Sequence, residues 1–456
     1  MSDTITMAAP IRTVHLTNYY HKSSGGISTS YNNLLAAAGR HKRHVSLIVP
    51  GETESVELIN DFAKIYFVPA RYSPIFDKRY RVMMPWQYMM TDSPIRKILL
   101  EEKPDLIEVT DKYTLSMIGP MIRRNAFKKL GRPVLVHFSC ERMDDNIGSF
   151  ISRGRAGKWF ASRIMGNYNF PSFDYHIANS AYTAQEFYES VAEVSKGGMF
   201  VNSLWRFFRA PRVKPADRIF VCPRGVDANF FTPDRWSDDI RKEMVERAGI
   251  PEKAIILLYA GRVSPEKNVE LLADMMRLLA ENKHHDFRLL VAGDGPKAEW
   301  LRQQSDGSSK RKIVLLGHLD KETLANYYAN TDVFVHPNPR EPFGIAPLEA
   351  MASGAPTVAP NAGGILSYAT SENAWLIEPT GKEFAHAVLE VVENEGIREA
   401  KIEHAIRTAR ENTREHSTDR LFETYDKIYE DFSSRPEMFT DGDSARNFDF
   451  KGKLLK

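Results

Sequence analysis

Short apolar runs, each followed by a helix-length stretch, constrain the fold of this chain more than any other feature. In the first half these runs occupy residues 45–49, 106–109, 134–136 and 175–178. They are rich in β-branched residues, and the stretches after them are long enough for crossover helices. This rhythm is typical of a parallel sheet covered by helices. We therefore expect an α/β domain over residues 1–215.

The same rhythm restarts in the second half and predicts a second parallel sheet. The apolar runs of this half lie at residues 219–222, 255–259, 287–291, 313–316, 333–335 and 357–359. Between the two halves, residues 209–215 combine two prolines with several basic residues, as linkers often do. We expect two Rossmann-like domains in an α/β chain, the second over residues 216–410.

The end of the chain predicts one more helix, over residues 411–432. Its apolar residues recur at helical spacing and form one stripe: Leu421, Phe422, Tyr425, Ile428, Tyr429 and Phe432. Residues 433–456 have few apolar residues that could form a core, so we expect a disordered tail.

Composition limits the cellular locations that we expect for this protein. No apolar run among the 456 residues approaches the roughly 18 to 20 needed to span a bilayer, and no cleavable leader is evident. The two cysteines fit a reducing compartment, so we expect a cytoplasmic protein. The net charge of +2 hides an asymmetry, because basic residues outnumber acidic ones over residues 1–218 and the reverse holds afterwards.

Residues 341–354 are the segment most informative about chemistry. A proline and Gly344 prevent a helix from starting before about Ile345, which leaves Glu341 on a loop and puts Glu349 within a helix. The preceding strand, 333–335, directs this loop to the carboxyl edge of the sheet, where open α/β sheets bind ligands. The amides of the helix N-terminus favour an anion, and the two carboxylates can accept hydrogen bonds from vicinal hydroxyls. A sugar diphosphate with its ribose fits this combination.

The segment Glu341-Pro-Phe-Gly-Ile-Ala-Pro-Leu-Glu349-Ala-Met-Ala-Ser-Gly resembles the donor-binding motif of retaining glycosyltransferases of family 4. That resemblance implies the GT-B fold, in which two Rossmann-like domains face each other across a cleft and a C-terminal helix packs back on the N-terminal domain. It also implies that Glu349 binds the ribose hydroxyls. Glu341, with the backbone of Phe343, Gly344 and Ile345, would hold the transferred sugar.

Other segments resemble the same family. Within Tyr-Ala-Gly-Arg-Val-Ser-Pro-Glu-Lys, the resemblance makes Arg262 and Lys267 the ligands of the donor diphosphate. Two cations at one strand end can neutralise a departing diphosphate without a metal, so we expect no metal and no cofactor. Gly25 and Gly26, which follow the first strand, are implied to approach the donor diphosphate. His137 is implied to contact the donor sugar, although a structural role for a histidine at a strand end stays equally open.

Two further motifs carry less chemistry. Pro223-Arg-Gly-Val-Asp resembles a family turn in which Arg224 replaces the usual asparagine, and we interpret Gly225 as its turn residue. Ala-Gly293-Asp-Gly295-Pro lacks the third glycine of a dinucleotide-binding loop, which argues against a nicotinamide cofactor.

The function that follows is transfer of a hexosyl group, with retention, from a nucleoside-diphosphate sugar to an acceptor hydroxyl. The donor is expected to be of the UDP-glucose type or GDP-mannose, and the acceptor a lipid-linked or free sugar in polysaccharide, glycolipid or glycoconjugate synthesis. Two alternatives stay open: a sugar-nucleotide hydrolase or epimerase of the same fold, and a non-catalytic protein that binds nucleotide sugars. We expect no nucleic-acid partner.

Residues 196–214 mix aromatic and basic residues, as segments at a membrane surface do. We expect peripheral contact with anionic lipid on the inner face of the membrane, with packing or a protein contact as the alternative. The apolar residues concerned are Phe200, Leu204, Trp205, Phe207 and Phe208. The basic residues concerned are Lys196, Arg206, Arg209, Arg212 and Lys214.

Overall fold

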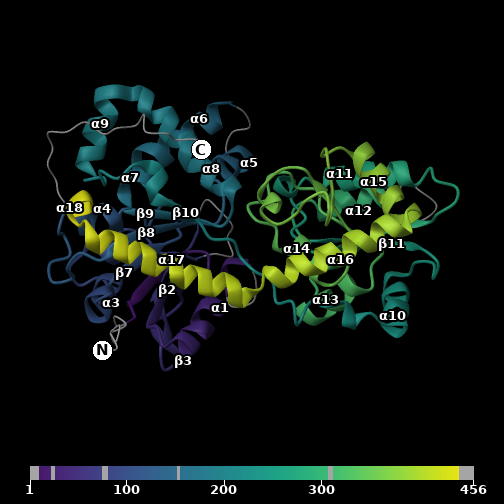
Figure 1. Ribbon diagram of the computed structural model, residues 1–456, viewed down its shortest axis with the longest axis horizontal. Coiled ribbons are helices and arrows are strands. Elements are labelled where there is room, and N and C mark those ends of the chain that lie inside the picture. The colour runs from purple at the N-terminus through teal and green to yellow at the C-terminus, as the bar shows by residue number, and fades with distance from the viewer. Residues whose placement is uncertain (1–9, 22–25, 74–80, 151–154, 307–311, 441–456) are drawn as a thin grey trace, which may run out of the picture. The chain divides into compact units, whose positions relative to one another are not determined.

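The computed structural model of the chain describes residues 10–21, 26–73, 81–150, 155–306 and 312–440. Its contacts divide the chain into two compact units (Figure 1). Unit 1 contains residues 1–222 and 418–456, and unit 2 contains residues 223–417. Among the described residues, none of the helices combines the length and the apolar character needed to cross a bilayer.

Unit 1 contains an eight-stranded sheet in the order β10-β9-β8-β7-β1-β2-β4-β3. All its neighbours pair in parallel except β3, which is antiparallel to β4 at the edge. The strands are β1 (Thr13–Leu16), β2 (Val45–Gly51), β3 (Ser55–Asn60), β4 (Ala63–Pro69), β7 (Leu106–Val109), β8 (Val134–Ser139), β9 (Tyr175–Ala178) and β10 (Ile219–Val221). A separate two-stranded ribbon pairs β5 (Arg71–Tyr72) with β6 (Arg81–Val82).

Helices cover both faces of this sheet, which explains why its strands are continuously apolar. On β2, Leu47 and Val49 pack in a cluster with α1 and α17, whereas Ile48 packs on the opposite face with α3 and α4. The α-helices of unit 1 are α1 (Gly26–His41), α2 (Trp86–Met89), α3 (Pro94–Glu102), α4 (Ile118–Arg123), α5 (Met143–Phe150), α6 (Arg155–Ile164), α7 (Phe170–Ser172), α8 (Ala181–Val194), α9 (Gly198–Phe207), α17 (Arg414–Ser434) and α18 (Glu437–Thr440). Shorter turns are the π-helical η1 (Met165–Asn169) and the 3₁₀ turns η2 (Ser195–Gly197) and η3 (Pro215–Arg218).

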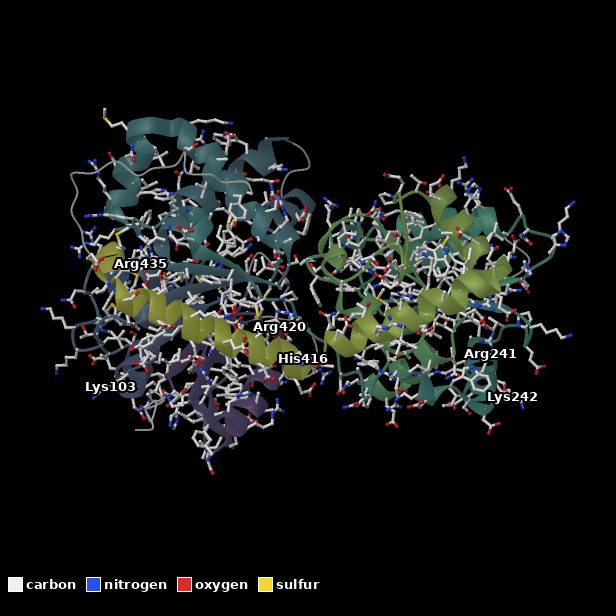
Figure 2. All side chains as sticks on the ribbon, viewed as in Figure 1. Lys103, Arg241, Lys242, His416, Arg420 and Arg435 are labelled. Carbon is white, nitrogen blue, oxygen red and sulfur yellow. The ribbon has the colours of Figure 1, made fainter. Side chains whose placement is uncertain are left out.

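Helix α17 confirms the expected return of the chain to its first unit. Its residues Phe422, Tyr425 and Ile428 are buried against the sheet of unit 1. The Tyr425 hydroxyl donates to the buried carboxylate of Glu108 on β7, which also accepts from the Tyr31 hydroxyl at 3.0 Å. Arg435, labelled in Figure 2, lies just after the helix and pairs with Asp431 at 2.7 Å. The stripe that the sequence predicts is therefore the buried face of α17.

The structure corrects three expectations about the borders. Residues 219–221 do not begin the second sheet, because β10 pairs with β9 in the sheet of unit 1. Residues 209–215 belong to unit 1, where Ala210 and Val213 are buried, so they are no linker. The expected disorder from residue 433 is wrong as far as residue 440, since α18 is helical and Phe439 is buried. Residues 441–456 lie outside the described residues.

Unit 2 contains a six-stranded, wholly parallel sheet in the order β13-β12-β11-β14-β15-β16. Its strands are β11 (Ile255–Ala260), β12 (Phe287–Ala292), β13 (Ile313–Gly317), β14 (Val333–Val335), β15 (Thr357–Pro360) and β16 (Trp375–Ile377). Its α-helices are α10 (Asp238–Ala248), α11 (Glu270–Leu279), α12 (Ala298–Asp306), α13 (Lys321–Ala329), α14 (Ile345–Ala352), α15 (Gly381–Glu393) and α16 (Glu395–Glu411). Three 3₁₀ turns complete it: η4 (Pro233–Arg235), η5 (Pro265–Lys267) and η6 (Gly364–Ser367).

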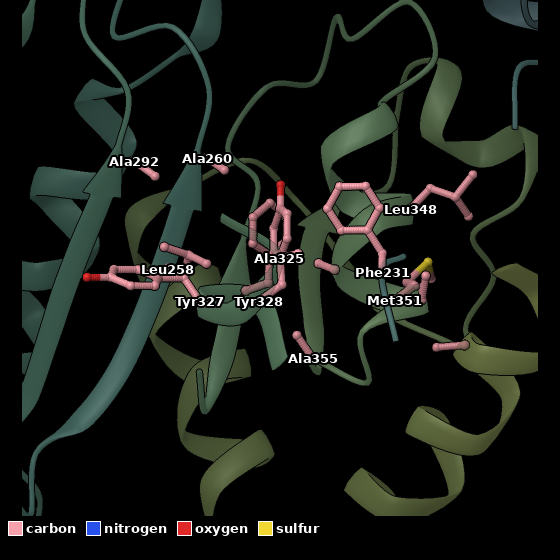
Figure 3. Packing of buried hydrophobic residues seen from close by; sticks show 14 of the residues in the cluster. Phe231, Leu258, Ala260, Ala292, Ala325, Tyr327, Tyr328, Leu348, Met351 and Ala355 are labelled. Carbon is pink, nitrogen blue, oxygen red and sulfur yellow. The ribbon is translucent and has the colours of Figure 1, made fainter. Parts of the chain in front are cut away.

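The core of unit 2 again has two layers, one on each face of the sheet. Leu258 on β11 belongs to the layer that also holds Phe231, Tyr328 and Met351, four residues from four segments of the chain (Figure 3). Its neighbour Leu257 belongs to the other layer. Successive side chains of a strand point to opposite faces, so both must find apolar partners. The expected fold class, α/β with two Rossmann-like parallel sheets, is confirmed.

The two ends of unit 2 meet. The backbone of Val226 pairs with Asn412 and Arg414 in a short parallel bridge, and the Ser417 hydroxyl donates to the Pro223 carbonyl at 2.7 Å. A side chain at Gly225 would place its Cβ 2.0 Å from the Thr413 carbonyl oxygen. Close approach between the two ends therefore requires this glycine, and it is more than the turn residue we expected.

Candidate functional site

The loop between β14 and α14 carries a buried carboxylate with several partners. Glu341 Oε2 accepts a hydrogen bond from Lys267 Nζ at 2.8 Å and one from Asn338 Nδ2 at 3.0 Å. The Nε2 atom of His336 lies 3.7 Å from the same oxygen. Strand β14 ends at Val335, so its carboxyl end delivers His336, Asn338 and Glu341 to one place.

The charge state of Glu341 follows from these partners. Burial alone would raise its pKa, but the positive charge of Lys267, the nearby His336 and the two donated hydrogen bonds outweigh burial and lower the pKa to about 2. Glu341 is therefore ionised over the whole physiological range. A carboxylate in this state accepts hydrogen bonds and donates none.

Helix α14 begins directly beside this carboxylate. Gly344 precedes it in the left-handed conformation, with φ 86°, and the Tyr368 hydroxyl donates to the Gly344 carbonyl. Residue 344 has no side-chain cap and the first turn has no acidic residue. Helix geometry leaves the first amides without intrahelical acceptors, so this end attracts an anion.

A glycine pair supports the loop from behind. The Gly364 amide donates to the Glu341 carbonyl at 2.6 Å. A Cβ at residue 364 would lie 1.9 Å from the Pro342 carbonyl oxygen, and one at Gly363 would lie 2.8 Å from the Pro339 carbonyl oxygen. Only glycine allows the chain after β15 to pass this close beneath the loop.

Glu349 is half-buried on α14 and accepts a 3.3 Å hydrogen bond from the Tyr328 hydroxyl. Burial raises its pKa to about 7, although Arg414, the hydrogen bond and Lys321 act in the opposite direction. Both cations pair with Asp227, at 3.1 Å for Arg414 and 3.5 Å for Lys321. Glu349 therefore lacks a direct counter-ion among its described contacts, and its charge is poorly compensated until a ligand donates to it.

This pKa predicts a gain in stability when Glu349 becomes glutamine. Because the folded-state pKa of about 7 exceeds the ordinary value of 4.5, the wild type should lose stability as pH rises from about 4.5 to 7, and level off above. Glu349→Gln should remove that loss and stabilise the protein at pH 8 by about 2 kcal/mol, while weakening donor binding. Thermal unfolding between pH 5 and 8 measures the first effect, with Glu403→Gln on the exposed face of α16 as the control. A variant that is less stable at pH 8 would contradict the assignment.

Arg262 and Lys267 follow β11 on a loop that is fastened to its neighbour. The Val263 amide donates to the Asp294 carbonyl at 3.0 Å. Cβ atoms at Gly293 and Gly295 would lie 1.8 Å and 2.3 Å from carbonyl oxygens of this loop. The two glycines thus allow two loops to touch, a role that the motif alone did not reveal. Arg262 is 39% exposed, with its guanidinium 3.9 Å from Glu266.

Comparison with known proteins connects this geometry to a family. Residues 240–410, which include both glutamates and both cations, match the family described as Glycosyl transferases group 1. The matched residues lie in the second half of the chain. The expected membership of glycosyltransferase family 4 is thereby confirmed.

Relatives and solved structures match most of this chain. It is 27% identical to the GDP-mannose-dependent alpha-(1-6)-phosphatidylinositol dimannoside mannosyltransferase of Mycobacterium tuberculosis, over 84% of this chain and 88% of the relative. It is 25% identical to a GDP-mannose-dependent alpha-mannosyltransferase of Corynebacterium glutamicum, over 78% and 73%. The structure of Anabaena HepE in complex with UDP and glucose covers 91% of this chain, over 99% of its own length, with a TM-score of 0.62 at 18% identity. That likeness supports the GT-B fold.

The structure brings together several of the residues expected at the donor site. Lys267 and Glu341 touch, and Gly344 and Ile345 form the adjoining helix start. Phe343 is buried and its ring packs 5.2 Å from that of Tyr368. Only its backbone can face a ligand, as we expected for the sugar-binding loop.

Three expected residues lie in unit 1. Gly25 lies outside the described residues, and Gly26 is the exposed first residue of α1. His137 lies within β8 with no exposed surface, between the rings of Phe173, His176 and Phe187. Burial lowers the pKa of His137 well below its ordinary value. The structure therefore supports packing, one of the two roles left open by the sequence, for His137.

Sequence reasoning missed the residues that support the site. Asn338 holds Glu341 and also accepts from the Arg340 amide at 3.0 Å, and Asn268 ties the β11 loop to the Pro337 carbonyl at 2.9 Å. Tyr328 reaches Glu349 from α13. An asparagine three residues before the loop glutamate is a local signal, whereas the other contacts depend on how separate loops meet.

Proposed function

We propose that this protein transfers a mannosyl group from GDP-mannose to an acceptor hydroxyl, with retention of the anomeric configuration. The observation that carries the proposal is the cluster of Lys267, Asn338 and Glu341 beside the open N-terminus of α14. It combines a cation and amides for a diphosphate with a permanently ionised acceptor for sugar hydroxyls. The choice of donor rests on relatives named as GDP-mannose-dependent, which match up to 84% of the chain.

In the proposed reaction the bond between the anomeric carbon and the diphosphate oxygen breaks, and a bond from that carbon to the acceptor oxygen forms. The acceptor proton passes to the departing diphosphate, so GDP and the mannoside are the products. Lys267 and Arg262 stabilise the charge that develops on the diphosphate. Glu341 accepts hydrogen bonds from the sugar, and Glu349 accepts them from the ribose. Since Glu341 is already held by two donors, we assign it to orientation of the sugar.

Incubation with GDP-mannose or UDP-glucose, with and without a lipid or sugar acceptor, tests the proposal. We expect GDP release that depends on the acceptor, and a product whose anomeric proton shows retained configuration. Release without an acceptor would indicate a hydrolase, and binding without turnover a binding protein. Turnover of UDP-glucose alone would replace the proposed donor. An inverted product would overturn retention.

We further propose that the reaction needs no divalent metal, because fixed cations and helix amides face the leaving group. Turnover should therefore persist after dialysis against EDTA. Loss of turnover that Mg²⁺ or Mn²⁺ restores would refute this part of the proposal and leave the donor assignment intact.

For the acceptor side we propose peripheral contact with anionic lipid through α9, with a lipid-linked acceptor and a cytoplasmic location at the inner face of the membrane. Of the expected apolar contacts, Phe200 and Phe207 are 68% and 56% exposed, and the neighbouring Met199 is 84% exposed. Trp205 and Phe208 are buried, and Trp205 Nε1 donates to the Gly166 carbonyl at 3.0 Å. The expectation that those two enter the lipid is therefore wrong.

The exposed pair gives a sharp test of this contact. Met199→Ser with Phe200→Ser should reduce sedimentation with anionic vesicles several-fold, because two apolar anchors are lost from a surface that also carries Lys196. Raising the salt concentration should release the wild type from the vesicles, because each Lys or Arg near such a surface contributes about 1 kcal/mol of electrostatic binding free energy, which salt screens. Leu58→Ser, at a 77% exposed apolar site on β3, serves as control. Equal binding to neutral and anionic vesicles would contradict the proposal.

A further inference from the structure

His336 has an unusual environment for a histidine. Its backbone amide joins the sheet by donating to Val358 O at 2.9 Å, and its side chain is only 5% exposed. Among the described residues, neither ring nitrogen has a hydrogen-bond partner. Buried polar atoms are nearly always paired, so an unpaired ring calls for an explanation. Glu341 Oε2 lies 3.7 Å from Nε2, slightly too far for a hydrogen bond.

The neighbouring ion pair shows what could complete this ring. Without a donor, Lys267 and Glu341 bind each other at 2.8 Å. The proposed function assigns Lys267 to the diphosphate and Glu341 to the sugar. A diphosphate carries two negative charges and competes strongly for the ammonium group. Once Lys267 turns to the diphosphate, the carboxylate of Glu341, whose side chain is 14% exposed, keeps only the Asn338 amide. A buried carboxylate that loses its cation is strongly destabilised.

We infer that His336 is a positioning residue that takes the place of Lys267 on Glu341 when the donor binds. The imidazole takes up one proton from solvent. Its Nε2–H then donates to Glu341 Oε2, which lies 3.7 Å away in the free protein. Lys267 is thereby released to the diphosphate, while Glu341 stays ionised and oriented toward the sugar. This inference rests on the proposed donor site, and it adds a proton to the binding step.

The electrostatics of the free site agree with this exchange. The charged groups that face the ring are Glu341 on its own loop and Lys267 on η5. The nearby Tyr259 on β11 stays a neutral phenol, because burial raises its pKa. In the free protein, burial lowers the pKa of His336 to about 4, with Glu341 raising it and Lys267 lowering it. Withdrawal of Lys267 removes a repulsive charge and leaves the attractive one, so the pKa of His336 rises on binding.

Calorimetry can count this proton. We would titrate GDP-mannose into the wild type and into His336→Gln at pH 5.5, in buffers of different ionisation enthalpy. A nucleotide sugar has no phosphate proton in this range, and proton release from Glu349 is common to both proteins. The wild type should therefore take up at least about half a proton per donor more than the variant. Binding with a difference below about 0.1 proton would overturn the inference, whereas absence of binding heat would count against the proposed donor site.

A second measurement needs no donor. In Lys267→Met, the Nε2 atom of His336 faces Glu341 without a competing ammonium group. Its pKa, followed by NMR of the ring protons and assigned with His336→Gln, should rise by at least about one unit over the wild type. The Lys312→Met variant, which removes a cation beside Asp286 at the other edge of the sheet, should leave it unchanged. An unchanged pKa in Lys267→Met would overturn the inference even if the donor binds.

Discussion

Replacement of Lys267 by methionine is expected to lower kcat/KM by roughly 10²- to 10³-fold, mainly through kcat. The ammonium group pairs with the Glu341 carboxylate in the free protein, and in the proposed reaction it pairs with the diphosphate. Charge on the leaving group peaks in the transition state, so the loss there exceeds the loss in the ground state. Methionine keeps most of the side-chain volume, which separates the missing charge from a packing defect.

Steady-state kinetics with the donor at several concentrations measures this effect. Lys312→Met is the matched control, because Lys312 is a half-buried lysine 3.7 Å from Asp286 and far along the sheet from the β14 loop. We expect the control to retain nearly full turnover. A Lys267→Met enzyme with normal kcat and a raised KM would show that the lysine only helps the donor to bind.

Replacement of Gly364 by alanine is expected to have the largest effect on the fold of the site. The added Cβ would lie 1.9 Å from the Pro342 carbonyl oxygen, a distance that forces either the 363–364 segment or the Glu341 loop to move. The added Cβ would meet backbone atoms of the other loop, and backbone atoms cannot move aside as the end of a flexible side chain can. We expect a loss of more than about 3 kcal/mol of stability, or a folded protein that no longer binds the donor.

Thermal unfolding and donor titration distinguish these two results. Gly396→Ala provides the control, because Gly396 lies in α16 with no heavy atom within 4 Å of the added Cβ. Alanine there should be neutral or stabilise the helix by up to about 1 kcal/mol. If Gly364→Ala unfolds and binds like the wild type, the contact between the two loops does not hold the site together.

Most of the fold was predictable because it depends on local pattern. Strands such as β11 are apolar at every position, and this pattern indicates a sheet with helices on both faces. The border between the units was not predictable in the same way. Ile219, Phe220 and Val221 form an apolar run that either sheet could have taken, and only pairing with β9 decides the matter. The burial of Ala210 and Val213 likewise depends on residues distant in sequence.

The residues of the site likewise differ in whether local sequence or distant contacts determine their positions. Glu341 and Glu349 were predictable, because a strand, a loop and a helix in one short segment determine their places. The partners of Glu341 come from two separate loops. The position of Lys267 in the sequence does not predict its 2.8 Å contact with Glu341. The surroundings of His137 could not be predicted from its own segment. Its position at the end of an apolar run is visible in the sequence, but the rings that enclose it come from residues 173, 176 and 187.

The meeting of the two ends of unit 2 has an evolutionary consequence. Val226 and Thr413 are bridged, and Ser417 donates to the Pro223 carbonyl, so the chain enters and leaves unit 2 at neighbouring points. A segment of this kind resembles a domain inserted into the surrounding chain. Recombination could replace it as one piece, while the strands and helices of unit 1 keep their order. A family built this way can vary its two units independently.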